Sequence, residues 1–154
     1  MIDKQLVFID LELNSREMVL DYIAEKTMNL GYVDNKTLFI SETMKREEML
    51  PTSIGYGIAI PHCRSLAVIK PFIAFLRLKN DLHWDEKNDE RVNLIFLIGT
   101  PEESGSNLHL KYLSNISRKL MHEEFREKLR LSKDSEVAFN LLNQINESIG
   151  KTEI

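Results

Sequence analysis

The chain has 154 residues and no dividing linker. Since domains commonly hold ~100–200 residues, we expect one domain over 1–154 with its core at about 5–147. The 20 basic and 24 acidic side chains leave a net charge of −4, which argues against nucleic-acid binding because that requires a basic surface. A single cysteine excludes an intrachain disulfide, and there is neither a signal peptide nor an apolar run of the ~20 residues that span a membrane. We therefore expect a soluble cytoplasmic protein.

Two helices are predicted in the first third of the chain. The run N-S-R-E that starts at Asn14 resembles a capping box with Asn14 as the N-cap. Apolar residues then recur at helical spacing up to Gly31, which is placed to end the helix in a left-handed conformation. A second helix is expected over about 35–49, because Pro51 stops it.

The middle of the chain changes to the pattern of strands. Short segments rich in β-branched and aromatic residues predict strands over 58–60, 72–78 and 92–98. The run 94–98 is apolar throughout, which suits a strand that is covered on both faces. The polar stretch 79–91 is expected to be a turn or an exposed connection.

Helical spacing returns from Asn107, and another helix is expected at about 135–145. Helices therefore stand before and after a strand-rich centre. This order predicts an α/β (α+β) sandwich, in which a mixed β-sheet is flanked by α-helices on both faces.

His62 is the residue that local sequence most suggests for chemistry. It follows Pro61 at the expected exit of the 58–60 strand, and residues at strand exits often line clefts in α/β sheets. Gly55 and Gly57 precede it and permit positive φ or a close backbone approach. A turn histidine without any role fits these local features equally well.

The other three histidines differ in their surroundings. His109 shares a helical stripe with Leu113 and is expected to face inward near a helix start. A hydrogen-bonded core histidine and an anion-binding group both fit that position. His83 and His122 have polar neighbours, so we expect both at the surface.

Cys63 beside His62 raises two alternatives, a metal site and a thiol nucleophile. Both require the two side chains to cooperate, but neighbouring residues of a strand point to opposite faces. The chain also has no C-x-x-C, H-E-x-x-H, P-loop or G-x-G-x-x-G motif. We therefore expect no metal and no cofactor.

The segment 46–64 closely resembles the signature of the fructose/mannitol-type (type 2) enzyme IIA domains of the bacterial phosphoenolpyruvate-dependent sugar phosphotransferase system. Members read R-E and, a few residues later, P-T-G-I-G-x-G-I-A-I-P-H. This chain has Arg46-Glu47 and then P-T-S-I-G-Y-G-I-A-I-P-H, which ends at His62. His109, followed by a leucine-rich helix, matches a second family element. Ser53 and Cys63 stand where many members have glycine, but neither replaces a residue that the chemistry needs.

The resemblance implies a phosphotransferase component that works as a phosphohistidine carrier. His62 matches the histidine that accepts a phosphoryl group from HPr and donates it to an enzyme IIB domain. His109 and Arg46 match residues that stabilise the phosphoryl oxygens. Contact with the membrane is implied only indirectly, through the sugar permease.

Two other functions stay open. One is a regulatory enzyme IIA paralogue of the nitrogen-related branch, whose phosphorylation state controls protein binding. The other, from a different class, is a non-catalytic binding domain, which would need no reactive histidine.

An apolar docking surface for HPr is expected around His62. Ile54, Tyr56 and Ile58 precede it in the sequence and are apolar, and Arg64 can meet acidic or phosphate groups. We expect this interface to be small and transient, because a carrier must release one partner before it engages the next.

Overall fold

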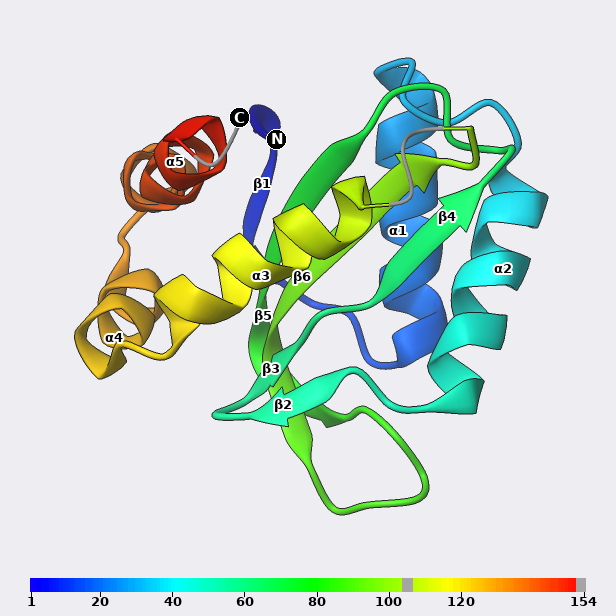
Figure 1. The fold of residues 1–154 in the computed structure, drawn as a ribbon. Helices are drawn as coiled ribbons and strands as arrows, with labels where there is room; N and C mark the ends of the chain where they lie inside the picture. Colours follow the sequence, from blue (N-terminus) through cyan, green and yellow to red (C-terminus); the bar gives the residue numbers. More distant parts are fainter. Residues whose placement is uncertain (104–106, 152–154) are drawn as a thin grey trace.

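The computed structural model describes residues 1–103 and 107–151, which form a mixed six-stranded β-sheet between two layers of helices (Figure 1). The sheet order is β1 (Ile2–Leu11), β5 (Phe72–His83), β6 (Arg91–Pro101), β3 (Ile58–Ala59) and β2 (Ser53–Gly55), and β4 (His62–Ser65) pairs with β6 beyond the end of β3. β5 and β6 are antiparallel, whereas β1 is parallel to β5, and β3 and β4 are parallel to β6.

The helices divide between the two faces of this sheet. α1 (Arg16–Asn29) and α2 (Lys36–Met49) cover one face, and α3 (Leu108–Leu120), α4 (Glu123–Leu131) and α5 (Ser135–Lys151) cover the other. The five apolar side chains at 94–98 are fully buried and alternate between the two cores. The predicted sandwich, and the prediction that 94–98 is covered on both faces, are confirmed.

The two N-terminal helices lie where they were predicted, with one correction. The N-cap of α1 is Ser15 rather than Asn14, because the Ser15 hydroxyl accepts a hydrogen bond from the Met18 N–H at 3.1 Å. Gly31 follows α1 with a φ of +83°, as the sequence predicted. α2 begins after the N-cap Asn35, whose side chain accepts a hydrogen bond from the backbone of the first turn.

Four elements were not predicted: β1, β2, β4 and α4. β1, at the edge of the sheet, mixes polar with apolar residues, and its pairing with β5 makes it a strand. β5 also continues to His83, so the expectation that 79–83 is a connection is wrong. Pairing with β6 extends this strand into a sequence that is polar and partly exposed.

Gly99 of β6 leaves room for the ring of Phe72 on β5. A Cβ atom at Gly99 would lie 2.3 Å from Phe72 Cε1, far inside van der Waals contact. We therefore expect Gly99→Ala to lower the free energy of unfolding by ~1–3 kcal/mol through overpacking, measured by urea denaturation. Gly150 in α5 is the matched control, since a Cβ there meets no atom within 4 Å. A similar loss in Gly150→Ala would contradict this explanation.

Candidate functional site

A cavity of about 250 Å³ lies at the start of β4, and residues from α2, β4 and α3 line it. Its lining consists of Glu42, Arg46, His62, Cys63, Arg64 and His109. The structure thus brings the three predicted catalytic residues together. His62 does lie just beyond the end of β3, but it also opens a strand of its own.

The pairing of β4 with β6 places His62 and Cys63. His62 lies opposite Ile98 and Cys63 opposite Gly99, and the Pro61 carbonyl accepts a hydrogen bond from the Ile98 N–H at 3.0 Å. Because side chains alternate along a strand, His62 is half-buried at the cavity while Cys63 packs into the core beneath α2. Burial raises the pKa of the Cys63 thiol to about 11, so the thiol is protonated at neutral pH and is a poor nucleophile.

The His62 ring is oriented by the backbone that leads into β4. Its Nδ1 lies 3.1 Å from the Ile60 carbonyl oxygen. A carbonyl can only accept, so this contact is a hydrogen bond when Nδ1 carries the proton. Nε2 is then the unprotonated nitrogen, and it has no hydrogen-bond partner within residues 1–103 and 107–151.

Burial is the main reason that the pKa of His62 is lowered from its ordinary value of 6.5. The hydrogen bond to Ile60 and the Glu47 carboxylate oppose this change, whereas the charge of Arg46 and the charge that His109 carries when it is protonated add to it. The imidazole is therefore neutral at pH 7, with a lone pair on Nε2. A neutral imidazole of this kind is a competent nucleophile.

His109 stands in the first turn of α3, partly exposed at the cavity. Burial, followed by the positive charge of Arg64, lowers its pKa. The interpretation of His109 as a core histidine is therefore wrong, because the buried apolar face of α3 is formed by other residues: Tyr112, Ile116 and Leu120. His83 and His122 are exposed, as predicted.

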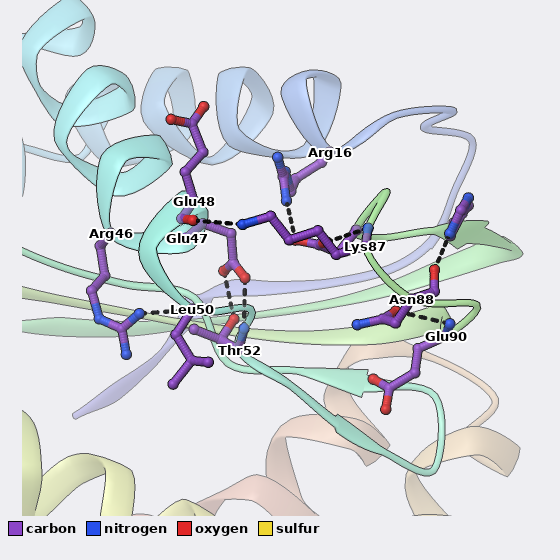
Figure 2. Close-up of polar contacts among 11 residues, drawn as sticks. Arg16, Arg46, Glu47, Glu48, Leu50, Thr52, Lys87, Asn88 and Glu90 are labelled. Atoms are coloured by element: carbon purple, nitrogen blue, oxygen red, sulfur yellow. Dashed lines mark hydrogen bonds and ion pairs between the residues drawn. The ribbon is translucent and has the colours of Figure 1, made fainter.

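Two guanidinium groups reach the cavity, and backbone carbonyls hold both of them. Arg46 Nη1 donates to the Leu50 carbonyl at 3.0 Å (Figure 2). Arg64 donates to the Glu102 carbonyl through Nε at 3.2 Å and through Nη2 at 2.9 Å. Fixed cations at a cavity wall can bind the oxygens of an anionic group without a metal.

Glu42 is a site residue that the sequence analysis missed. Its Oε1 accepts a hydrogen bond from the Ser65 hydroxyl at 2.7 Å, which ties α2 to β4. The sequence could have pointed to Glu42, because it lies one helical turn before Arg46 and therefore on the same face of α2.

The expected docking residues do not form one surface. Ile58 is 0% exposed in the core, so its assignment to a docking surface is wrong. Ile54 and Tyr56 are exposed, but they belong to the β2–β3 hairpin, where the Arg126 guanidinium of α4 lies 3.8 Å from the centre of the Tyr56 ring. Among the four expected docking residues, Arg64 is the one that lines the His62 cavity.

The described ranges, 1–103 and 107–151, contain no cluster of three or more His, Cys, Asp or Glu side chains placed to hold a metal ion. Within these ranges there is also no helix with the length and apolarity needed to cross a membrane.

A comparison with known protein families identifies the family of this chain. The family model for the phosphoenolpyruvate-dependent sugar phosphotransferase system, EIIA 2, matches residues 1–145. The chain belongs to this family. As an EIIA protein it is a phosphotransferase component, and the match includes all the residues that line the cavity.

Two relatives of this EIIA protein have names of different kinds. It is 31% identical to the PTS system fructose-specific EIIA component of Haloferax volcanii, and the match covers 93% of this chain and 92% of the relative. It is also 33% identical to the nitrogen regulatory protein of Bradyrhizobium diazoefficiens, over 86% of this chain and 85% of the relative.

Solved structures show the same fold. The nitrogen regulatory protein IIA-Ntr from Neisseria meningitidis matches with a TM-score of 0.82 and 24% identity, over 92% of this chain and 95% of that one. Enzyme IIAMTL from Escherichia coli, in a complex with phosphorylated enzyme IIBMTL, matches with a TM-score of 0.76 and 19% identity, over 94% of this chain and 98% of that one.

Proposed function

We propose that this EIIA protein is a phosphohistidine carrier that takes a phosphoryl group from HPr on His62 and gives it to an enzyme IIB domain for coupled sugar uptake. The observation that carries the proposal is the neutral His62 ring, with Nδ1 bound to a carbonyl and Nε2 free in a cavity that also holds Arg46, Arg64 and His109. The complex of enzyme IIAMTL with phosphorylated enzyme IIBMTL supports an enzyme IIB partner.

The transfer needs one bond to form and one to break. The Nε2 lone pair of His62 attacks the phosphorus of the donor's phosphohistidine, and the electron pair of the broken P–N bond returns to the donor imidazole. The Nδ1 proton stays in place, so the Ile60 carbonyl stabilises the positive charge that the His62 ring acquires. In the second transfer a thiolate or a neutral imidazole of enzyme IIB attacks the phosphorus, and the electron pair of the broken P–N bond returns to Nε2 of His62.

The residues around His62 suit the charge of this reaction. Phosphoryl transfer has a loose transition state with negative charge on the equatorial oxygens, so positioning and electrostatics supply most of the catalysis. Arg46, Arg64 and the imidazole N–H of His109 are donors at the wall of the cavity. Together they provide the stabilisation that a metal ion supplies in other phosphotransferases.

The test is incubation of the purified protein with phospho-HPr, with intact-mass analysis of the product. We expect one phosphoryl group per chain, labile to acid as a P–N bond is, and we expect EDTA to leave the rate unchanged. Transfer onward to a purified enzyme IIB then completes the assay. A protein that stays unmodified by phospho-HPr would overturn the proposal.

The pH dependence of the reaction is set by the lowered pKa of His62. Protonation of Nε2 removes the nucleophilic lone pair, and a lowered pKa moves that protonation to more acidic pH. We expect the rate to be constant around pH 7 and to fall only below the ordinary histidine pKa of 6.5. An NMR titration of the His62 ring checks the assignment, and a rate that already falls above pH 6.5 would contradict it.

Leu50, Leu66 and Leu110 have exposed apolar side chains, and each lies within four residues in sequence of a residue that lines the cavity. Leu50 provides the carbonyl that binds Arg46, and Leu110 comes directly after His109. We assign the apolar contacts with HPr and enzyme IIB to these three residues. Ile54 and Tyr56 stay predicted contacts for the part of a partner that extends over the hairpin.

The proposal places the protein in the cytoplasm, with membrane contact only through the permease.

A regulatory role is the second candidate, and the 33% identity to a nitrogen regulatory protein favours it. Both roles use the same chemistry at His62, so they differ in the fate of the phosphoryl group. Transfer from His62 to enzyme IIB supports the carrier. A stable phosphohistidine that reaches no enzyme IIB but changes the binding of other proteins would favour regulation.

A further inference from the structure

Glu47 is a buried carboxylate close to the site, and it does not line the cavity. It lies in the last turn of α2 and is 1% exposed. Its Oε2 accepts a hydrogen bond from the Thr52 N–H and its Oε1 accepts one from the Thr52 hydroxyl, each at 2.6 Å. Figure 2 shows both bonds, with the neighbouring Glu48 side chain pointing away from them. Thr52 therefore donates to both oxygens of a buried carboxylate.

Thr52 connects this carboxylate to the backbone that orients His62. The Thr52 carbonyl accepts a hydrogen bond from the Ile60 N–H at 3.1 Å. The carbonyl of the same Ile60 residue accepts the Nδ1 proton of His62 at 3.1 Å. A chain of hydrogen bonds thus runs from Glu47 through Thr52 and Ile60 to the His62 ring.

We propose that Glu47 is a positioning residue for phosphoryl transfer: by clamping Thr52 it holds the Ile60 backbone where its carbonyl keeps the proton on His62 Nδ1 and leaves Nε2 unprotonated. This inference rests on the proposed role of His62. Charge-assisted hydrogen bonds are short and strong, so a buried carboxylate holds Thr52 more firmly than a neutral side chain would. Glu47 acts through the backbone and does not touch the phosphoryl group.

The negative charge of Glu47 also acts on the charge of the His62 ring. It raises the pKa of His62, against the larger lowering by burial and the lowering by Arg46 and His109. A carboxylate near the ring also stabilises the positive charge that His62 acquires on phosphorylation. Loss of this charge is therefore expected to shift the acidic limb of the pH–rate profile to lower pH.

The experiment compares Glu47→Gln with Glu48→Gln. Both remove one negative charge from the end of α2, but the Glu48 side chain is exposed, and it is the backbone carbonyl of Glu48 that accepts a hydrogen bond from Lys87 Nζ. Long-range ¹⁵N NMR of the unphosphorylated protein reports which ring nitrogen of His62 carries the proton. We expect the wild type and Glu48→Gln to hold it on Nδ1, and Glu47→Gln to show a mixture of the two tautomers. The rate of phosphorylation by phospho-HPr is expected to fall about 10–100-fold in Glu47→Gln alone.

A second pair of variants decides the matter if Glu47→Gln does not fold. Thr52→Ser keeps both donors to Glu47, whereas Thr52→Val removes the hydroxyl and leaves Oε1 without its partner. We expect Thr52→Ser to keep the Nδ1 tautomer and the native rate. We expect Thr52→Val to show a mixture of the two tautomers and a lower rate of phosphorylation.

Two results would overturn the inference. One is a pure Nδ1 tautomer together with a native rate in folded Glu47→Gln, or in Thr52→Val where the first variant does not fold. The other is a rate that falls only in proportion to the fraction of folded protein, as it would if Glu47 were purely structural. The tautomer is read without any phosphoryl donor. Failure of the wild type to react with phospho-HPr would therefore count against the proposed function. The effect of Glu47 on the His62 tautomer would still be tested by the NMR measurement.

Discussion

We expect His62→Ala to accept no phosphoryl group from phospho-HPr while its fold and melting temperature stay close to those of the wild type. The imidazole is the nucleophile of the proposed reaction, and alanine offers no nitrogen for a P–N bond. The side chain is half-buried at a cavity and hydrogen-bonds to the Ile60 carbonyl, so its removal leaves both hydrophobic cores intact. Intact-mass analysis under neutral conditions measures the phosphorylation.

His122→Ala is the matched control for this variant. His122 is exposed at the start of α4, and its side chain forms no capping hydrogen bond. The His122→Ala variant should react with phospho-HPr at the native rate. An acid-labile phosphoryl group on His62→Ala would show that another residue is the acceptor, and the assignment of the site would be wrong.

His109→Ala is expected to slow phosphorylation of His62 by on the order of 10²–10³, the usual cost of losing one donor to a transition state. His62 itself stays in place, so the slow product still carries its phosphoryl group there. His109 is partly exposed, so its truncation should shift the melting temperature by less than about 2 °C. Stopped-flow or quenched-flow rates, together with a thermal melt, separate the two effects.

His109→Gln tests whether a donor is what the site needs. Glutamine keeps an N–H at the cavity, and we expect it to recover part of the rate that alanine loses. A large drop in melting temperature with an unchanged rate would assign His109 a structural role instead. Equal rates for alanine and glutamine would show that the N–H of His109 contributes nothing to transfer.

Elements defined by local patterns were predictable from the sequence. Asn35 and Gly31 mark helix ends because capping and left-handed backbone are local properties. The strand at 94–98 was predictable because a short, wholly apolar segment must be covered on both sides. β1 and β4 were missed because their conformation depends on pairing with β5 and β6, which are distant in the sequence.

The same division applies to the site. The sequence by itself was enough to predict which side chains carry the chemistry: the family signature that ends at His62 points to Arg46 and His62, and the resemblance of the later histidine and leucine-rich helix to a second family element points to His109. Only the tertiary structure decided where they lie and what surrounds them. Ile58 proved to be buried rather than part of a docking surface, and Glu42 proved to line the cavity. Neither could be predicted, because burial and the packing of α2 on β4 depend on long-range strand pairing. The contact of His62 Nδ1 likewise depends on where the Ile60 carbonyl lies, and Ile60 is held there by the hydrogen bond of its N–H to the Thr52 carbonyl, a contact that forms only when the chain folds back on itself.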